Sequence, residues 1–117
     1  MVKIAVASKD GKVVNQHFGR ADKFYILEVD EEIAGFKLSE KRSIVPVCHH
    51  GDHESDQMKQ AVSNLSDCQY VLVSRIGMRA RNELETLGVE AYEIPGIIEE
   101  SVDKLIRYIR VQKLLKF

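Results

Sequence analysis

The sequence contains only two cysteines, Cys48 and Cys68, which excludes a scaffold held together by a disulfide framework. No apolar run approaches the roughly 20 residues that a transmembrane helix needs, so no membrane partner is expected. The formal net charge of -1 gives no general attraction to nucleic acid or to an anionic membrane. We therefore expect a cytoplasmic protein with reduced thiols and no nucleic-acid partner.

Several motifs of enzymes and of secretion are also missing. The first eight residues carry a single Lys and no long apolar segment, so they predict a strand rather than a signal peptide. There is no Walker A loop, no G-x-G-x-x-G and no G-x-S-x-G nucleophile elbow. The first strand carries Ala5, Val6, Ala7 and Ser8 where a nuclease with paired Mg²⁺ ions needs carboxylates. Nuclease activity is therefore disfavoured.

What is present predicts one α/β domain over residues 1–117, because the chain has no repeat, linker or low-complexity segment. Apolar and β-branched runs predict strands at residues 2–7, 24–30, 36–45, 70–73 and 89–94. Residues 8–22 are rich in turn formers and predict a long loop with a short ribbon at Val13–Val14. Helices are expected to begin near Glu54, Gly77 and Gly96.

The apolar residues at helical spacing define the faces that we expect to be buried. These faces are Met58, Ala61, Val62 and Leu65; Ala80, Leu84 and Leu87; and Ile98, Val102, Leu105, Ile106 and Ile109. The order β-β-β-α-β-α-β-α predicts a ribonuclease-H-like mixed sheet of about five strands with flanking helices, the polar third strand being an edge. In open sheets of this kind, ligands bind beyond the carboxyl ends of the strands. The 8–22 loop, the segment after the third strand and Ser74–Gly77 would meet there.

The segment Cys48–His53 is the strongest chemical signal, with Cys48, His49, His50 and His53 inside six residues. Thiolate and imidazole are the ligands of zinc, copper(I) and iron, so this segment predicts a metal contact. A closed structural zinc site is disfavoured because no second C-x-x-C pair exists to complete four ligands. The alternative is a solvated polar loop without a metal.

Three further features allow an ordinary structural interpretation. The helix that starts at Gly77, with Arg75, Arg79 and Arg81 close in sequence, predicts either an anion site or a solvated arginine face. His17 is expected to point outward from a loop that Phe18 anchors, which by itself needs no function. Cys68 is expected to be a small buried side chain.

Two stretches then resemble a known family. Residues 4–24, I-A-V-A-S-K-D-G-K-V-V-N-Q-H-F-G-R-A-D-K-F, are similar to the opening of the dinitrogenase iron-molybdenum cofactor biosynthesis family, which includes NifX-like proteins and the C-terminal domain of NifB. Residues 71–92 resemble its second signature, so the resemblance spans essentially the whole chain. It implies a ribonuclease-H-like fold, a non-enzymatic protein that binds an iron-sulfur or iron-molybdenum cluster or its precursor, and cofactor-assembly proteins as partners.

The resemblance also implies site residues. His17 matches the family's H-F-G histidine, a cofactor ligand, and Gly19 and Arg20 complete that motif. We expect His17, Cys48, His49, His50 and His53 to be metal ligands, with Arg20, Arg75 and the helix start at Gly77 stabilising an anionic cluster. The 48–53 segment departs from the Gly-rich stretch common in NifX-like members, so we expect it to set the cargo. The alternatives are a zinc- or copper-binding protein that uses only this segment, and an interaction or regulatory module without cargo.

Overall fold

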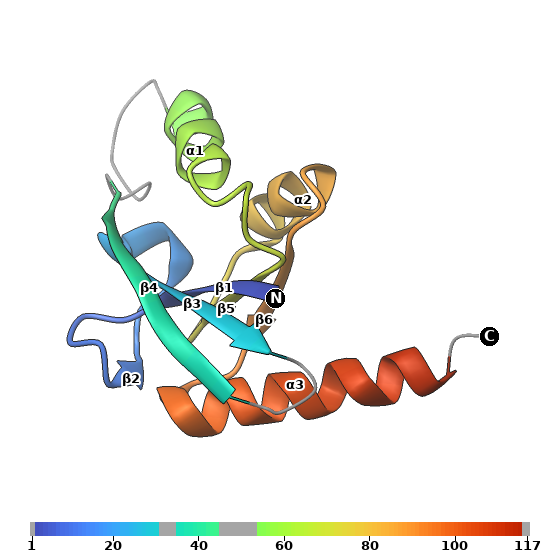
Figure 1. Ribbon diagram of the computed structural model, residues 1–117. Helices are drawn as coiled ribbons and strands as arrows, with labels where there is room; N and C mark the ends of the chain where they lie inside the picture. The colour runs from blue at the N-terminus through green and yellow to red at the C-terminus, as the bar shows by residue number, and fades with distance from the viewer. Residues whose placement is uncertain (1, 31–34, 45–53, 116–117) are drawn as a thin grey trace.

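A five-stranded mixed sheet lies at the centre of the computed structural model, which describes residues 2–30, 35–44 and 54–115, with residues 54–57 as backbone only (Figure 1). The strand order is β4-β3-β1-β5-β6, and a separate two-stranded ribbon joins β2 to β7. The strands are β1 (Val2–Ala7), β2 (Val13–Val14), β3 (Lys23–Asp30), β4 (Gly35–Ser43), β5 (Tyr70–Val73), β6 (Glu90–Glu93) and β7 (Gly96–Ile97). The helices are the 3₁₀ turn η1 (Phe18–Arg20), α1 (Glu54–Ser63), α2 (Met78–Thr86) and α3 (Ile98–Leu115).

The strand directions follow from the connections. β1 pairs antiparallel with β3, and β3 pairs antiparallel with β4. β1 pairs parallel with β5, and β5 pairs parallel with β6, through crossovers that contain α1 and α2. The expected mixed sheet of five strands with flanking helices is therefore confirmed, and β4 is an edge strand as its polar sequence predicts.

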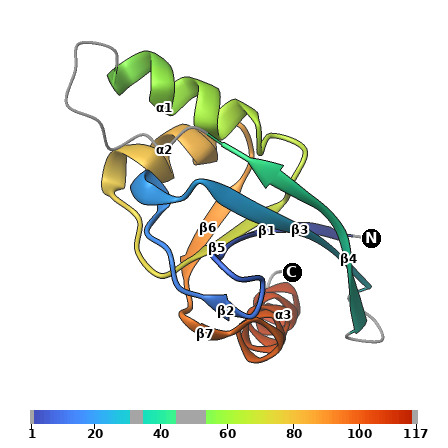
Figure 2. The same ribbon diagram turned by 90° about the vertical axis from the view of Figure 1, so that its left-hand side faces the viewer.

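The helices cover both faces of the sheet, as Figures 1 and 2 show. Alternation along β1 sends Ala5 and Ala7 into a core with α1 and α2, and Ile4 and Val6 into a core with α3. The predicted face of α3 is confirmed, because its five residues Ile98, Val102, Leu105, Ile106 and Ile109 are buried. None of the helices in the described ranges is long and apolar enough to cross a membrane.

The end of β4 and the side chain of Leu87 differ from expectation. β4 ends at Ser43, and Val45 lies outside the described residues. The prediction that Leu87 faces inward is wrong, because 44% of this residue is exposed. The helix ends at Thr86, and the backbone of Leu87 is no longer helical (φ -96, ψ 5), so its side chain leaves the face set by Ala80 and Leu84. Gly88 follows with φ 79 and closes the helix, as predicted.

The loop after β1 is organised by one carboxylate. Asp10 Oδ1 accepts hydrogen bonds from the backbone N–H groups of Lys12 (2.9 Å) and Val13 (3.2 Å), which lower the pKa of Asp10. The loop then forms β2, which pairs with β7, a strand that periodicity did not predict. Ile98 N–H donates to the Lys12 carbonyl (3.0 Å), so the start of α3 is fixed to the same loop. The predicted ribbon at Val13–Val14 is thus confirmed, whereas its partner strand β7 was not predicted.

Candidate functional site

Residues 16–18 are joined to the segment that follows β5. Ser74 N–H donates to the Gln16 carbonyl (3.0 Å), and Phe18 N–H donates to the Arg75 carbonyl (2.9 Å). His17 and Arg75 form a parallel bridge between these two bonds. This short pairing lies just beyond the carboxyl end of β5, which runs parallel to β1. Two predicted site residues far apart in sequence are therefore backbone neighbours at the expected edge of the sheet.

Phe18 anchors this loop and leaves His17 at the surface. The Phe18 ring is 2% exposed, and its centroid lies 5.8 Å from that of Phe24 in the core beneath α1 and α2. The turn η1 follows, with Arg20 N–H donating to the His17 carbonyl (3.1 Å). His17 and Arg20 are exposed and Gly19 is half-buried. The expectation that Phe18 packs inward and His17 points outward is confirmed.

The chain leaves β4 beside the same loop. Ile44 is buried, and its N–H donates to the Asp22 carbonyl (2.9 Å). Ile44 is also the last described residue before α1 begins at Glu54. The predicted ligands Cys48, His49, His50 and His53 lie outside the described residues. Within residues 2–30, 35–44 and 58–115, no three His, Cys, Asp or Glu side chains form a group that could hold a metal ion.

The start of α2 differs from the predicted anion site in one respect. Gly77 is the N-cap with extended backbone (φ -76, ψ 159) and has no side-chain cap. The preceding N–H, that of Ile76, already donates to Glu93 Oε2 (2.9 Å) at the end of β6. A carboxylate therefore occupies the backbone donor just before the helix start and adds negative charge to this edge. Sequence reasoning missed Glu93, although its place at the end of a parallel strand puts it on this edge.

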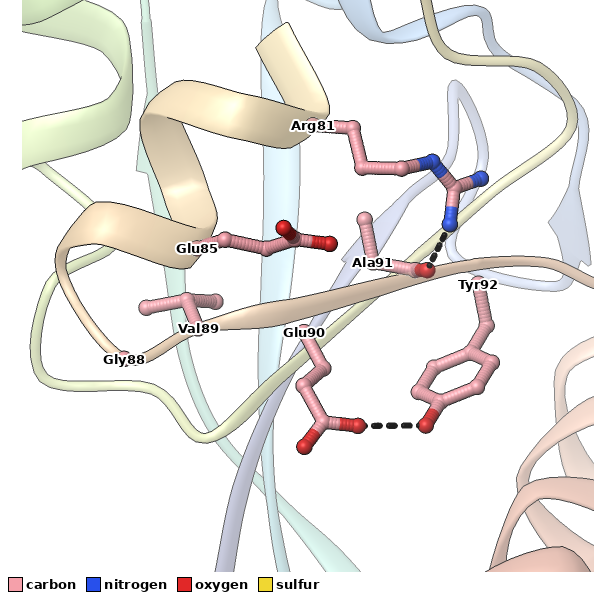
Figure 3. Close-up of a pocket in the computed structure, with 7 residues that line it drawn as sticks. All are labelled: Arg81, Glu85, Gly88, Val89, Glu90, Ala91 and Tyr92. Carbon is pink, nitrogen blue, oxygen red and sulfur yellow. Dashed lines mark hydrogen bonds between the residues drawn. The ribbon is translucent and has the colours of Figure 1, made fainter. Parts of the chain in front are cut away.

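Arg81 does not join the predicted basic group. Its guanidinium donates to the Ala91 carbonyl (2.9 Å) and lines a separate hollow beside β6, as Figure 3 shows. Arg81 is close to the helix start in sequence, but its side chain is turned toward β6 and does not add to a basic group there. Arg75 and Arg79 are exposed.

Two polar side chains beneath His17 and Arg75 were not predicted. Gln16 is 8% exposed, and its Oε1 is buried without a hydrogen-bond partner among the described protein atoms. Ser74 Oγ is also buried without a hydrogen-bond partner among the described protein atoms. A buried polar atom without a partner costs about 1–3 kcal/mol, so water or a bound polar group would be stabilised at this position. Neither stands out in the sequence, because Gln16 lies in the polar run 15–17 and Ser74 simply follows the apolar strand that ends at Val73.

Cys68 has the expected environment. Its thiol is buried on the α1 and α2 side of the sheet, and burial raises its pKa to about 12. The negative charge of Asp67 acts in the same direction. A thiol with this pKa is protonated at neutral pH and is a poor metal ligand. The cysteine available for a metal in the proposed ligand set is therefore Cys48.

Comparison with known proteins gives a consistent pattern. Residues 1–108 match the family described as dinitrogenase iron-molybdenum cofactor. The FeMo cofactor biosynthesis protein NifB of Frankia alni is 36% identical over 108 residues, which are 90% of this chain and 21% of that protein. NifB of Chlorobaculum tepidum is 36% identical over 99 residues, which are 85% of this chain and 22% of that protein. The chain thus spans about a fifth of the length of these relatives.

Solved structures share the fold. The crystal structure of PH0822 has a TM-score of 0.64 and 25% sequence identity, and the match covers 92% of this chain and 90% of that one. The apo form of the orange protein from Desulfovibrio gigas has a TM-score of 0.62 at 19% identity, with 92% and 89% of the two chains covered. Because the sequence identity to the orange protein is low, this second match shows a shared fold and nothing more.

Proposed function

Because the chain belongs to the dinitrogenase iron-molybdenum cofactor family, we propose that it is a non-enzymatic carrier in metallocofactor assembly. Its cargo is an iron-sulfur or iron-molybdenum cluster, or a precursor of one. Cofactor-assembly proteins deliver and receive this cargo. We also propose that the mixed sheet and its flanking helices have the ribonuclease-H-like fold.

One observation carries the proposal: the parallel bridge between His17 and Arg75. It places an imidazole-bearing residue and a guanidinium-bearing residue side by side, both exposed, at the edge where ligands of open α/β sheets bind. Imidazole is a ligand for iron and other borderline metals, whereas a guanidinium stabilises the negative charge of a sulfide-bridged cluster. The pair therefore offers both interactions that an anionic metal cluster requires.

The remaining proposed residues complete an open site. Cys48, His49, His50 and His53 add soft and borderline donors to His17, and Arg20 and the helix start at Gly77 add positive potential. Gly19 lies within the 3₁₀ turn that follows the histidine. An open position suits a carrier, because cargo held at a surface can be transferred without unfolding the protein. Glu93 limits how much negative charge the helix start can stabilise.

Anaerobic titration with a preformed iron-molybdenum-sulfur cluster, followed by gel filtration, absorption spectra and metal analysis, tests the proposal. We expect the wild type to retain the cluster and both His17→Ala and Cys48→Ala to lose at least about tenfold in affinity. Lys12→Ala, an exposed change in the same loop region, is the control and should bind normally. Failure of the wild type to bind above background would exclude the carrier, as would unchanged binding by both variants.

A second candidate is a zinc or copper(I) protein that uses only the Cys48–His53 segment. The observation that favours it is the presence of four possible ligands within six residues. Parallel titrations with Zn²⁺ and Cu⁺ separate the two candidates. Binding of the simple ions that is abolished by Cys48→Ala and unaffected by His17→Ala would support this second candidate. No binding of any metal would favour the interaction or regulatory module.

A further inference from the structure

The C-terminal half of α3 extends past the sheet, as Figure 1 shows. The last aromatic contact with the sheet is made by Tyr108, whose ring centroid lies 5.5 Å from that of Tyr92 on β6. Tyr92 in turn lies 6.1 Å from Tyr70 on β5, measured between ring centroids. The helix continues for two more turns, to Leu115. We call residues 108–115 the helix overhang.

The helix overhang exposes apolar side chains that the domain does not cover. Tyr108 is 46% exposed, Val111 53%, Leu114 72% and Leu115 73%. Tyr108, Val111 and Leu115 follow one another at intervals of three and four residues, so they form one stripe along the helix. An exposed apolar group of this size on one element is typical of an interaction surface.

The charge on α3 is divided between its two ends. Its first turns carry Glu99, Glu100 and Asp103, whereas residues 104–115 carry four basic residues and no acidic one. These basic residues are Lys104, Arg107, Arg110 and Lys113. Arg107 is already paired with Asp103 within the helix (3.1 Å). Because basic residues flank the apolar stripe, a partner surface that carries negative charge complements it.

The same chain provides such a surface next to the helix overhang. A hollow of about 410 Å³ beside β6 is lined by Arg81, Glu85, Gly88, Val89, Glu90, Ala91 and Tyr92 (Figure 3). It has two carboxylates and one guanidinium, which leaves it net negative, and Val89, Ala91 and the Tyr92 ring make it partly apolar. Tyr92 belongs both to this hollow and to the contact with Tyr108, so the hollow adjoins the root of the helix overhang.

We propose that a second copy of this chain covers the helix overhang. Two overhangs pack antiparallel about a two-fold axis near Val111, so that the apolar end of each helix lies on Tyr108 of the other. This arrangement moves the basic residues of each helix end toward Glu85 and Glu90 of the opposite copy, which offsets the repulsion between the two basic helices. Because each copy offers both the helix and the hollow, the contact is isologous and closes at two subunits.

Sedimentation velocity of the full chain, from about 0.1 μM to about 100 μM, tests this dimer. We expect a dimer with a micromolar dissociation constant, and a loss of about tenfold or more in affinity for Val111→Asp. Leu38→Asp is the matched control, because Leu38 is 58% exposed on β4 at the opposite edge of the sheet. Circular dichroism confirms that both variants fold. A wild type that stays monomeric throughout would overturn the proposal.

A charge exchange tests the register. Glu85→Lys and Lys113→Glu should each weaken the dimer several-fold, because each places like charges together in the proposed contact. The double variant should recover most of the wild-type affinity, since it restores opposite charges. Additive losses in the double variant would contradict the proposed pairing of helix overhang and hollow.

Discussion

At the scale of single residues, two glycines, Gly11 and Gly77, differ in what a side chain would meet. Gly11 has φ 75, and an added Cβ would lie 3.0 Å from the Tyr25 ring. We therefore expect Gly11→Ala to lower the free energy of unfolding by about 1–2 kcal/mol. Gly77 has φ -76 and no atom within 4 Å of an added Cβ, so Gly77→Ala should cost less than about 1 kcal/mol.

Urea unfolding at neutral pH measures both values. Because the two variants make the same chemical change, their difference isolates backbone conformation and the contact with Tyr25. Equal stability of Gly11→Ala and Gly77→Ala would show that the left-handed backbone at Gly11 is not required.

Cys68 allows a test of burial by reactivity. The thiolate is the reactive form, and burial raises the pKa of Cys68 to about 12. In a Cys48→Ala background, alkylation by iodoacetamide at pH 8 should therefore be at least about a hundredfold slower than that of a free thiol. Mass spectrometry of the folded protein gives the rate, and the same protein in urea provides the reactive reference. Labelling of the folded chain at the rate of a free thiol would contradict the buried position.

At the scale of elements, one ion pair joins β4 to the turn that follows α1. The Arg42 guanidinium donates from both Nη atoms to the two carboxylate oxygens of Asp67, at 2.7 Å each. These bonds hold the pKa of Asp67 well below its ordinary value. The stabilisation is present above the unfolded pKa, about 3.9, and is lost as pH falls through the lower pKa of the folded state.

Asp67→Asn should therefore be less stable than the wild type at pH 7, by about 1 kcal/mol, because Asp67 is partly exposed to solvent. The difference should shrink as pH falls below about 4, because the Asp67 carboxylate of the unfolded chain takes up a proton there while that of the folded chain stays ionised to lower pH. Urea unfolding of both proteins from about pH 7 to about pH 2.5 measures this convergence. A gap that does not change with pH would rule out the ion pair as its source.

Much of the sheet was predictable because short apolar runs and crossover rules leave few arrangements. The face of α3 from Ile98 to Ile109 followed from helical spacing, and the edge position of β4 from its polar sequence. β7 was not predictable, since a pair of residues gains its strand conformation from its partner β2 and has no periodicity. The inward orientation predicted for Leu87 was wrong because α2 ends at Thr86, one residue before it. Helical spacing alone does not reveal where a helix ends.

At the scale of the whole molecule, topology predicted which segments meet at the candidate site better than it predicted the contacts between them. The carboxyl ends of β1 and β5 bring the His17 loop and Arg75 together, as the strand directions require. The bond from Ile76 to Glu93 and the orientation of Arg81 depend on side-chain rotamers and on where α2 begins. Such details come from tertiary packing, and a pattern of residue types does not encode them.

The most direct test of the central claim is a double-mutant cycle on cluster binding with His17→Ala, Arg75→Ala and the combined variant. If both residues contact one cargo, each single change weakens binding, and the combined loss differs from the sum by at least about 0.5 kcal/mol. Dissociation constants from anaerobic titration with the iron-molybdenum-sulfur cluster give this coupling. Binding that is unaffected by all three variants, or losses that are strictly additive, would contradict a shared site at this edge of the sheet.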